Sequence, residues 1–198
     1  MKKTLLISAL MAFVLTSAHA SLFVYSVIFS SLGEAASSPG TGSGTVIYDN
    51  IAHTLDLSCS FSGLLGTTTA SHIHAATVSP FTGNAGVATT TPSFALFPLG
   101  VTSGTFANVL DLTLASSYNP AFVTANGGTT ASAEIALTTA IANGQAYWNI
   151  HTSFAPGGEI RGFLTPVPEP SSLALVGLFT AGAVGRAWRR KVRAADKA

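Results

Sequence analysis

The chain has 198 residues, of which only 9% are charged, against about a quarter in typical soluble domains. Its net charge of +1 averages unlike segments, because residues 21–165 hold six acids and one base, a balance of −5, and the other bases lie near the two ends. A hydrophobic content of 47% argues against disorder, and the acidic middle segment argues against nucleic acid as a partner, since phosphate binding needs a basic patch.

The first 20 residues have the pattern of a secretory signal peptide. Two lysines precede an apolar stretch from Leu5 to Leu15, and Ala18-His19-Ala20 places small residues around a cleavage site. The apolar stretch is too short to span a membrane as a helix. We therefore expect residues 1–20 to be removed on export.

The middle segment carries the signals of an antiparallel β domain. The clearest strand is 54–61, in which apolar and polar residues alternate. Two stretches, 117–126 and 131–142, have helix-like spacing and are separated by Gly127-Gly128. Many short strands with frequent turns indicate an all-β fold, an antiparallel Greek-key-like sandwich or barrel with one or two short helices. The other predicted strands are 22–30, 45–48, 71–75, 87–91, 94–97, 102–107, 145–152 and 159–164.

Three histidines are the candidate metal ligands. His72 and His74 share one face of a predicted strand, because alternate residues of a strand point the same way, and Ile73 faces the core. His151 has the matching position on a later strand, and neutral imidazole binds zinc and copper. The three side chains converge only if the two strands are neighbours, which the sequence leaves open. The alternative is that the histidines are structural and hydrogen-bond to backbone and carboxylate groups. The sequence establishes no cofactor, and zinc and copper are the candidates.

A second group of residues surrounds Arg161, the only base of the middle segment. In so acidic a domain we expect its guanidinium to pair with a carboxylate, and Glu34 and Glu159 are the candidates. A structural ion pair is the favoured interpretation, and an anchor for the carboxylate of a ligand is the alternative. The sequence has no nucleophile elbow and no phosphate-binding loop.

The C-terminal end has three features in a fixed order. Pro168-Glu169-Pro170 precedes the apolar segment 171–185, and a basic cluster begins at Arg186. As a helix this segment is roughly 22 Å long, or about 27 Å when extended to Trp188, which can cross a bilayer core of about 30 Å with mild thinning. The arrangement resembles the PEP-CTERM sorting signal. That resemblance implies an exosortase-type protease, transient anchoring in the inner membrane, and then delivery to the cell surface or extracellular matrix.

Three blocks of the middle segment resemble the CHRD (chordin-type) domain. They are Ser-His-Ile-His at 71–74, Tyr-Trp-Asn-Ile-His-Thr at 147–152 and Pro-Gly-Gly-Glu-Ile-Arg-Gly at 156–162, and the resemblance runs from about residue 29 to residue 164. The family opens with a Glu and paired prolines, whereas here Glu34 is followed by Ala-Ala-Ser-Ser-Pro. The resemblance implies a secreted β domain without an established enzymatic activity.

We therefore expect a signal peptide at 1–20, a CHRD-like β domain at 21–165 and a sorting segment at 166–198. The expected function is that of an exported surface or matrix protein whose domain binds an envelope protein or polysaccharide and catalyses no reaction. The alternative is a copper or zinc redox protein or metalloenzyme that uses the His-x-His strand.

Overall fold

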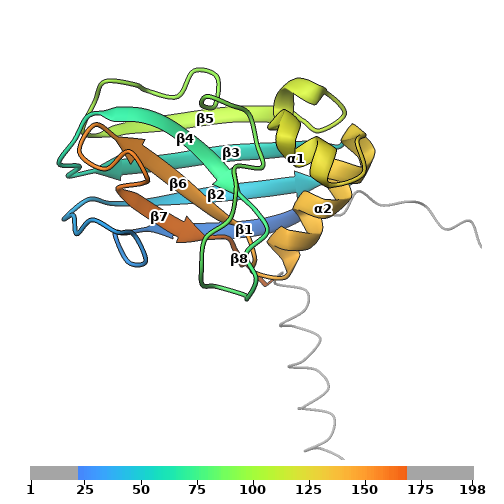
Figure 1. The fold of residues 1–198 in the computed structure, drawn as a ribbon, viewed down its shortest axis with the longest axis horizontal. Coiled ribbons are helices and arrows are strands. Elements are labelled where there is room, and N and C mark those ends of the chain that lie inside the picture. The colour runs from blue at the N-terminus through green and yellow to red at the C-terminus, as the bar shows by residue number, and fades with distance from the viewer. Residues whose placement is uncertain (1–21, 169–198) are drawn as a thin grey trace, which may run out of the picture.

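The computed structural model describes residues 22–168, which form two packed antiparallel β-sheets with short helices at one end (Figure 1). The predicted class, an antiparallel β-sandwich with one or two short helices, is confirmed. The signal peptide 1–20 and the apolar helix expected at 171–185 lie outside the described residues. No helix within 22–168 is long and apolar enough to cross a membrane.

The large sheet forms from the segments that alternate most clearly. In β3 (Thr54–Ser62) every second residue from Leu55 to Phe61 is buried and the residues between them are exposed, as in a strand with one face on a core. The turn from β2 to β3 is held by the Asp49 carboxylate, which accepts the N–H groups of Ile51 and Ala52 at 2.8 and 2.9 Å. The sheet order is β5-β3-β2-β1-β8, with β5 at Gly104–Asp111, β2 at Thr41–Asp49, β1 at Leu22–Phe29 and β8 at Thr165–Pro166.

The small sheet has the order β4-β6-β7, with β4 at Thr68–His74, β6 at Tyr147–Thr152 and β7 at Ile160–Phe163. Every residue of β6 is buried, although alternate residues face opposite sides. One face of β6 packs on the core and the other is covered by loops. At one corner the two sheets meet, because the backbones of Ser30 and Arg161 exchange hydrogen bonds of 3.1 and 2.9 Å.

The helices close one end of the sandwich (Figure 1). After a short 3-10 turn at Ala115–Ser117, α1 (Pro120–Ala125) starts with proline in its first turn and is capped by the Asn119 side chain. Helix α2 (Thr130–Ala142) begins with a capping box between Thr129 and Ser132. Both predicted helices are present, and α1 is shorter than the stretch 117–126 that suggested it.

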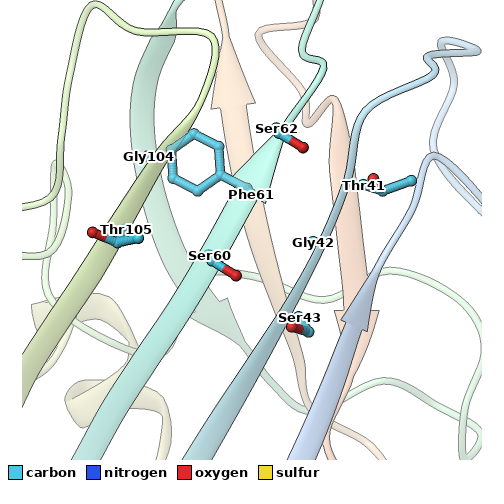
Figure 2. A pocket seen from close by; sticks show the side chains of 8 residues that line it. All are labelled: Thr41, Gly42, Ser43, Ser60, Phe61, Ser62, Gly104 and Thr105. Atoms are coloured by element: carbon cyan, nitrogen blue, oxygen red, sulfur yellow. The ribbon is translucent and has the colours of Figure 1, made fainter.

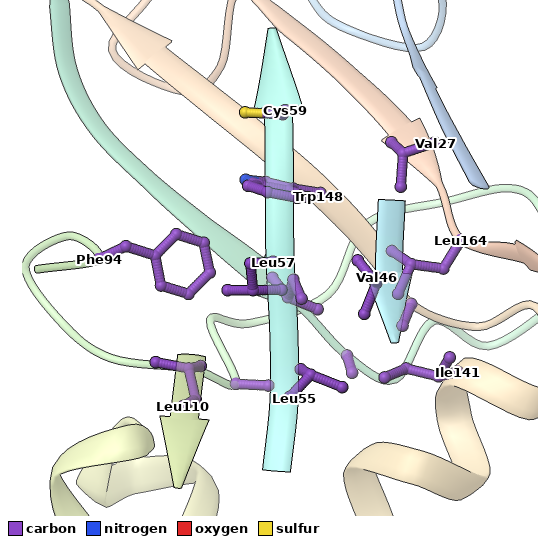
Figure 3. Close-up of a cluster of buried hydrophobic side chains, with 14 of the residues drawn as sticks. Val27, Val46, Leu55, Leu57, Cys59, Phe94, Leu110, Ile141, Trp148 and Leu164 are labelled. Atoms are coloured by element: carbon purple, nitrogen blue, oxygen red, sulfur yellow. The ribbon is translucent and has the colours of Figure 1, made fainter. Parts of the chain in front are cut away.

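The core lies between the sheets and is centred on Trp148 of β6 (Figure 3). Its indole ring contacts the rings of Phe29, Phe94 and Phe106 edge-on, with centroids 5.5 to 6.1 Å apart. The indole N–H donates to the hydroxyl of Ser71 at 2.7 Å, so this polar group is satisfied inside the core. Figure 3 shows Leu55, Leu57 and Cys59 of β3 in the same cluster as Trp148, with Ile141 at the end of the cluster next to α2.

Two predicted strands, 87–91 and 94–97, are wrong, because these residues form a loop along the free edge of β4. The hydroxyls of Thr89 and Ser93 accept backbone N–H groups of β4 at 2.9 and 3.0 Å, where a neighbouring strand would offer carbonyls. Side-chain oxygens do not repeat along a backbone, so the pairing does not propagate into a strand. The β-branched and aromatic composition of this loop instead reflects burial, with Phe94 only 2% exposed.

Candidate functional site

The structure brings the three predicted histidines together on the outer face of the small sheet. Strand β4 lies beside β6 with His72 opposite Asn149 and His74 opposite Tyr147, so their side chains and that of His151 project from one face. One ring nitrogen from each histidine can be chosen so that all three lie within 4.8 Å of one another. The three residues are buried, at 6%, 8% and 9% exposed.

Backbone carbonyls of the covering loops fix the tautomer of each ring. A carbonyl oxygen only accepts, so the ring nitrogen beside it carries the hydrogen, and the other nitrogen of a neutral ring carries a lone pair. The contacts are His72 Nε2 to Pro92 O at 2.5 Å, His74 Nδ1 to Ala85 O at 2.9 Å and His151 Nδ1 to Pro156 O at 2.9 Å.

The three remaining nitrogens face one another. Nδ1 of His72 lies 3.2 Å from Nε2 of His151. Nε2 of His74 is buried without a hydrogen-bond partner in the part of the chain that the structure describes. The cluster is therefore a set of three inward-facing acceptors, each held in place by a loop.

Burial sets the charge of the cluster. Desolvation lowers the pKa of all three imidazoles, and it lowers the pKa of His74 most, to about 4, with further lowering by the charges of His151, His72 and Arg161. At neutral pH the rings are uncharged, which is the form that coordinates metal ions.

Arg161 lies beside this cluster on β7. Its Nη1 donates to Asn84 Oδ1 at 2.6 Å, its Nε lies 3.4 Å from Glu34 Oε1, and its guanidinium carbon is 4.7 Å from the centre of the Tyr147 ring. Tyr147 in turn stacks on His74, with centroids 4.8 Å apart. Desolvation raises the pKa of the Glu34 carboxyl more than Arg161 lowers it. Arg161 thus links two parts of the site: it pairs with Glu34 of the covering loop, and through Tyr147 it contacts the histidine cluster.

Glu159 has a different environment from the one expected. Its carboxylate is fully buried and accepts hydrogen bonds from three parts of the chain, and none of its contacts is with Arg161. Burial alone would raise its pKa, but these hydrogen bonds outweigh burial and lower it. Of the two candidate partners of Arg161, the structure places Glu34 beside it. The donors to Glu159 are Ser38 Oγ at 2.6 Å, Leu65 N at 2.6 Å, Gly66 N at 3.1 Å and Thr152 Oγ1 at 2.5 Å.

A pocket of about 540 Å³ opens beside the cluster. Its walls include the loop at 33–36, the loop at 155–158 and the side chains of His74, Tyr147 and Arg161. Four buried side-chain atoms in the described residues lack a hydrogen-bond partner, and all four belong to residues that line this pocket. The four atoms are Glu34 Oε1, His74 Nε2, Asn149 Oδ1 and Arg161 Nε. Glu34 Oε1 and Arg161 Nε form an ion pair at 3.4 Å, so His74 Nε2 and Asn149 Oδ1 are the atoms to which a ligand or ion can supply the missing contact.

A second hollow, of about 570 Å³, lies on the large sheet and has a different character (Figure 2). It runs across the ends of β2, β3 and β5 and is lined by serine, threonine and glycine with the edge of Phe61. None of the residues that line it is titratable. It offers hydroxyls for polar contacts.

Sequence reasoning missed the loop residues that complete the site. Ala85, Pro92 and Pro156 act through backbone carbonyls. Every residue has such a carbonyl, so the residue type does not indicate this role. Asn84 has a suitable side chain, but nothing in its surroundings indicates that it meets Arg161. Tyr147 could have been identified from the sequence, because it shares a strand face with His151.

Of the sorting motif, Pro168 is exposed at the last described position, and Glu169 and Pro170 lie outside the described residues.

Comparison with known proteins identifies both parts of the chain. The CHRD domain model matches residues 25–164, and the PEP-CTERM protein-sorting motif matches residues 166–191. No curated protein and no solved structure is significantly similar to the chain. The sorting motif marks an exported protein that an exosortase processes. Because the domain match covers most of its length, the chain belongs to the CHRD domain family, and it carries a PEP-CTERM sorting motif directly after that domain.

Proposed function

We propose that this protein is a module of the cell surface or extracellular matrix, and that its tail is a temporary membrane anchor. The observation that carries the proposal is the order of the parts, because the sorting motif begins at residue 166, two residues after the CHRD match ends. The signal peptide at 1–20 is removed on export. The apolar segment at 171–185 then holds the chain in the inner membrane until the exosortase cuts near Pro168-Glu169-Pro170.

Intact mass of the protein recovered from its native host tests this processing. We expect a species that begins near Ser21 and lacks the basic cluster at 186–193. Glu169→Ala should leave the anchor attached, and Ser171→Ala, just after the motif, is the matched control. A wild-type protein that keeps residues 189–198 in a host with an active sorting protease would contradict the proposal.

The domain itself acts as a binding or structural module, and its partner is an envelope protein or polysaccharide. Two features support this role. The buried ionisable residues Glu34, Glu159 and Arg161 are bound by other parts of the same domain, and the family carries no established activity. The pocket beside His74 and Arg161 is the candidate contact surface, since two of its polar atoms, His74 Nε2 and Asn149 Oδ1, have no partner among the described residues.

Co-sedimentation with envelope fractions separates the two partner classes. Binding that disappears after protease treatment of the envelope identifies a protein partner, and binding that survives it identifies a polysaccharide. Asn149→Ala changes the pocket, and Ser60→Ala on the exposed face of the large sheet is the control. If the protein sediments with neither the untreated nor the protease-treated envelope, the binding role is wrong.

A second candidate function is that of a copper or zinc redox protein or metalloenzyme. The observation that favours it is the cluster of His72, His74 and His151. Elemental analysis of the purified protein combined with a superoxide turnover assay distinguishes the two functions. Stoichiometric metal together with superoxide turnover would support the metalloenzyme and contradict the surface module. Absence of turnover would leave the surface module as the supported function.

A further inference from the structure

The three inward-facing nitrogens cannot satisfy one another. With the outer nitrogens of His72 and His151 donating to backbone carbonyls, the two inner nitrogens, 3.2 Å apart, are both acceptors. Two lone pairs at that distance repel unless a positive charge lies between them. The inner nitrogen of His74 adds a third acceptor, which is buried and unpaired. This geometry calls for a cation shared by the three rings.

A proton is a poor choice for that cation at neutral pH. All three rings are more than nine-tenths buried, and a buried imidazolium loses its hydration without gaining a carboxylate here. The metal-ligand group that contains the three histidines includes no Asp, Glu or Cys among the described residues. The guanidinium of Arg161 lines the same pocket as His74, and like charges repel, so it disfavours a second positive charge there.

The dimensions suit a small divalent ion. Zinc binds imidazole nitrogen at about 2.0–2.1 Å, and a tetrahedral angle then places two such nitrogens about 3.4 Å apart. The inner nitrogens of His72 and His151 are already close to that separation at 3.2 Å. The whole group lies within 4.8 Å, so the widest pair of nitrogens must close by at most about 1.4 Å to reach the tetrahedral separation.

The outer shell is already built. In metal sites a ligating histidine donates its second ring N–H to a carbonyl or carboxylate, which fixes its tautomer and orientation. Here Pro92, Ala85 and Pro156 supply a carbonyl to each of the three rings. A purely structural histidine would use both nitrogens in hydrogen bonds, and His74 does not.

We propose that His72, His74 and His151 form a three-nitrogen site for one Zn²⁺ or Cu²⁺ ion. Imidazole suits these two metals, and the lack of carboxylate oxygens disfavours Mg²⁺ and Ca²⁺. Three protein ligands leave one coordination position for a water or an oxygen ligand, and the pocket beside His74 is the side from which it can enter. The inference deepens the second candidate function by naming ligands and metal, and it holds whether or not the domain catalyses a reaction.

The test uses the full chain, stripped with a chelator and then titrated separately with Zn²⁺ and with Cu²⁺. We expect one ion per chain, and for Cu²⁺ an electron paramagnetic resonance spectrum with splitting from coordinated imidazole nitrogen. His74→Gln and His151→Gln should each weaken binding by more than about 100-fold, the upper range for loss of an outer-shell partner. His53→Ala is the matched control, because His53 lies outside the cluster and pairs with Glu134.

The unmutated chain decides the matter if a variant fails to fold. Failure of the wild-type protein to take up either ion, or uptake that His74→Gln and His151→Gln leave unchanged in folded protein, would overturn the site. Binding of a metal without nitrogen splitting in the Cu²⁺ spectrum would also overturn it. Export and tail processing of His74→Gln, followed by intact mass in the same strains, test the surface-module proposal independently.

Discussion

The two outer faces of the sandwich are built from similar strands and have opposite characters. The outer face of the large sheet is exposed and carries small hydroxyl side chains, as at Ser60 and Ser62 of β3 (Figure 2). The outer face of the small sheet carries histidine, tyrosine, asparagine and arginine, and all of β6 is buried. The difference lies in the loops, because those that hold Glu34, Ala85, Pro92 and Pro156 fold over the small sheet only.

Covering a polar face with loops raises the free-energy cost of leaving its polar side chains without a partner. A hydroxyl exposed to water needs no protein partner, whereas a buried charge must be paired or hydrogen-bonded. On the covered side Glu159 has four donors and Arg161 has a carboxylate, an amide oxygen and an aromatic ring. We therefore expect substitutions on this side to be far more destabilising than similar changes on the exposed face.

The largest effect is expected for Glu159→Ala. The change leaves the buried N–H groups of Leu65 and Gly66 and the hydroxyl of Thr152 without an acceptor. Losing a buried charged partner should lower the free energy of unfolding by about 4 kcal/mol, measured by guanidinium denaturation. A loss below about 1 kcal/mol would mean that water replaces the carboxylate and that this side is less well covered than it appears.

Arg161→Ala should cost somewhat less, about 3 kcal/mol, because it leaves the buried Glu34 carboxylate without a counter-charge. Glu34 can take up a proton, which limits the loss. Adding Glu34→Gln to Arg161→Ala should recover part of the stability, since the unpaired charge is then gone. Equal stability of the single and double variants would show that the two residues are not coupled.

Asn84→Ala tests the covering loop with a neutral residue. The amide oxygen of Asn84 accepts from Arg161 at 2.6 Å, and a hydrogen bond to a charged group is worth about 1.5–3 kcal/mol. We expect a loss near the lower end, about 1.5 kcal/mol, because the guanidinium keeps its contacts with Glu34 and Tyr147. Unchanged stability would mean that the loop is held by its backbone contacts alone.

The pH dependence of stability should depend on Glu159. Its folded-state pKa is lowered from the ordinary value of 4.5, so its ionised form stabilises the fold above pH 4.5, and this contribution disappears as pH falls through the folded pKa. The difference in unfolding free energy between wild type and Glu159→Gln should be constant near pH 7. Below about pH 5 it should shrink by at most about 1.4 kcal/mol per pH unit. A difference that grows as pH falls would contradict the assigned direction.

The smallest effect is expected for Ser60→Ala on the exposed face of the large sheet. Ser60 is solvent-exposed, and surface substitutions of this kind usually change stability by less than about 0.5 kcal/mol. The same denaturation experiment measures it beside Glu159→Ala, Arg161→Ala and Asn84→Ala. A loss above 1 kcal/mol would indicate that this face is covered too, for example by a second molecule.

Pattern and composition predicted those parts of the fold that depend on local chemistry. Alternation in 54–61 identified β3 because one side of that strand meets water, and helix-like spacing with its glycine break identified both helices. The loop at 87–97 was misread because a buried loop and a strand share the same residue types. The Glu159 environment was also missed, since its four donors come from segments up to 121 residues away in sequence.

The sequence alone predicted an exosortase-sorted exported protein, the β class and the three histidines proposed here as metal ligands, because each depends on local order or on the alternation of a single strand. Only the tertiary structure decided which residues meet. Strand order placed β4 beside β6 and so joined His72 and His74 to His151 across 79 and 77 positions. The packing of the loops then placed a backbone carbonyl beside each imidazole ring and Glu34 beside Arg161. The same packing surrounded the Glu159 carboxylate with hydrogen-bond donors from the loops. These outcomes depend on which distant segments pack together, and no single segment of the chain encodes that.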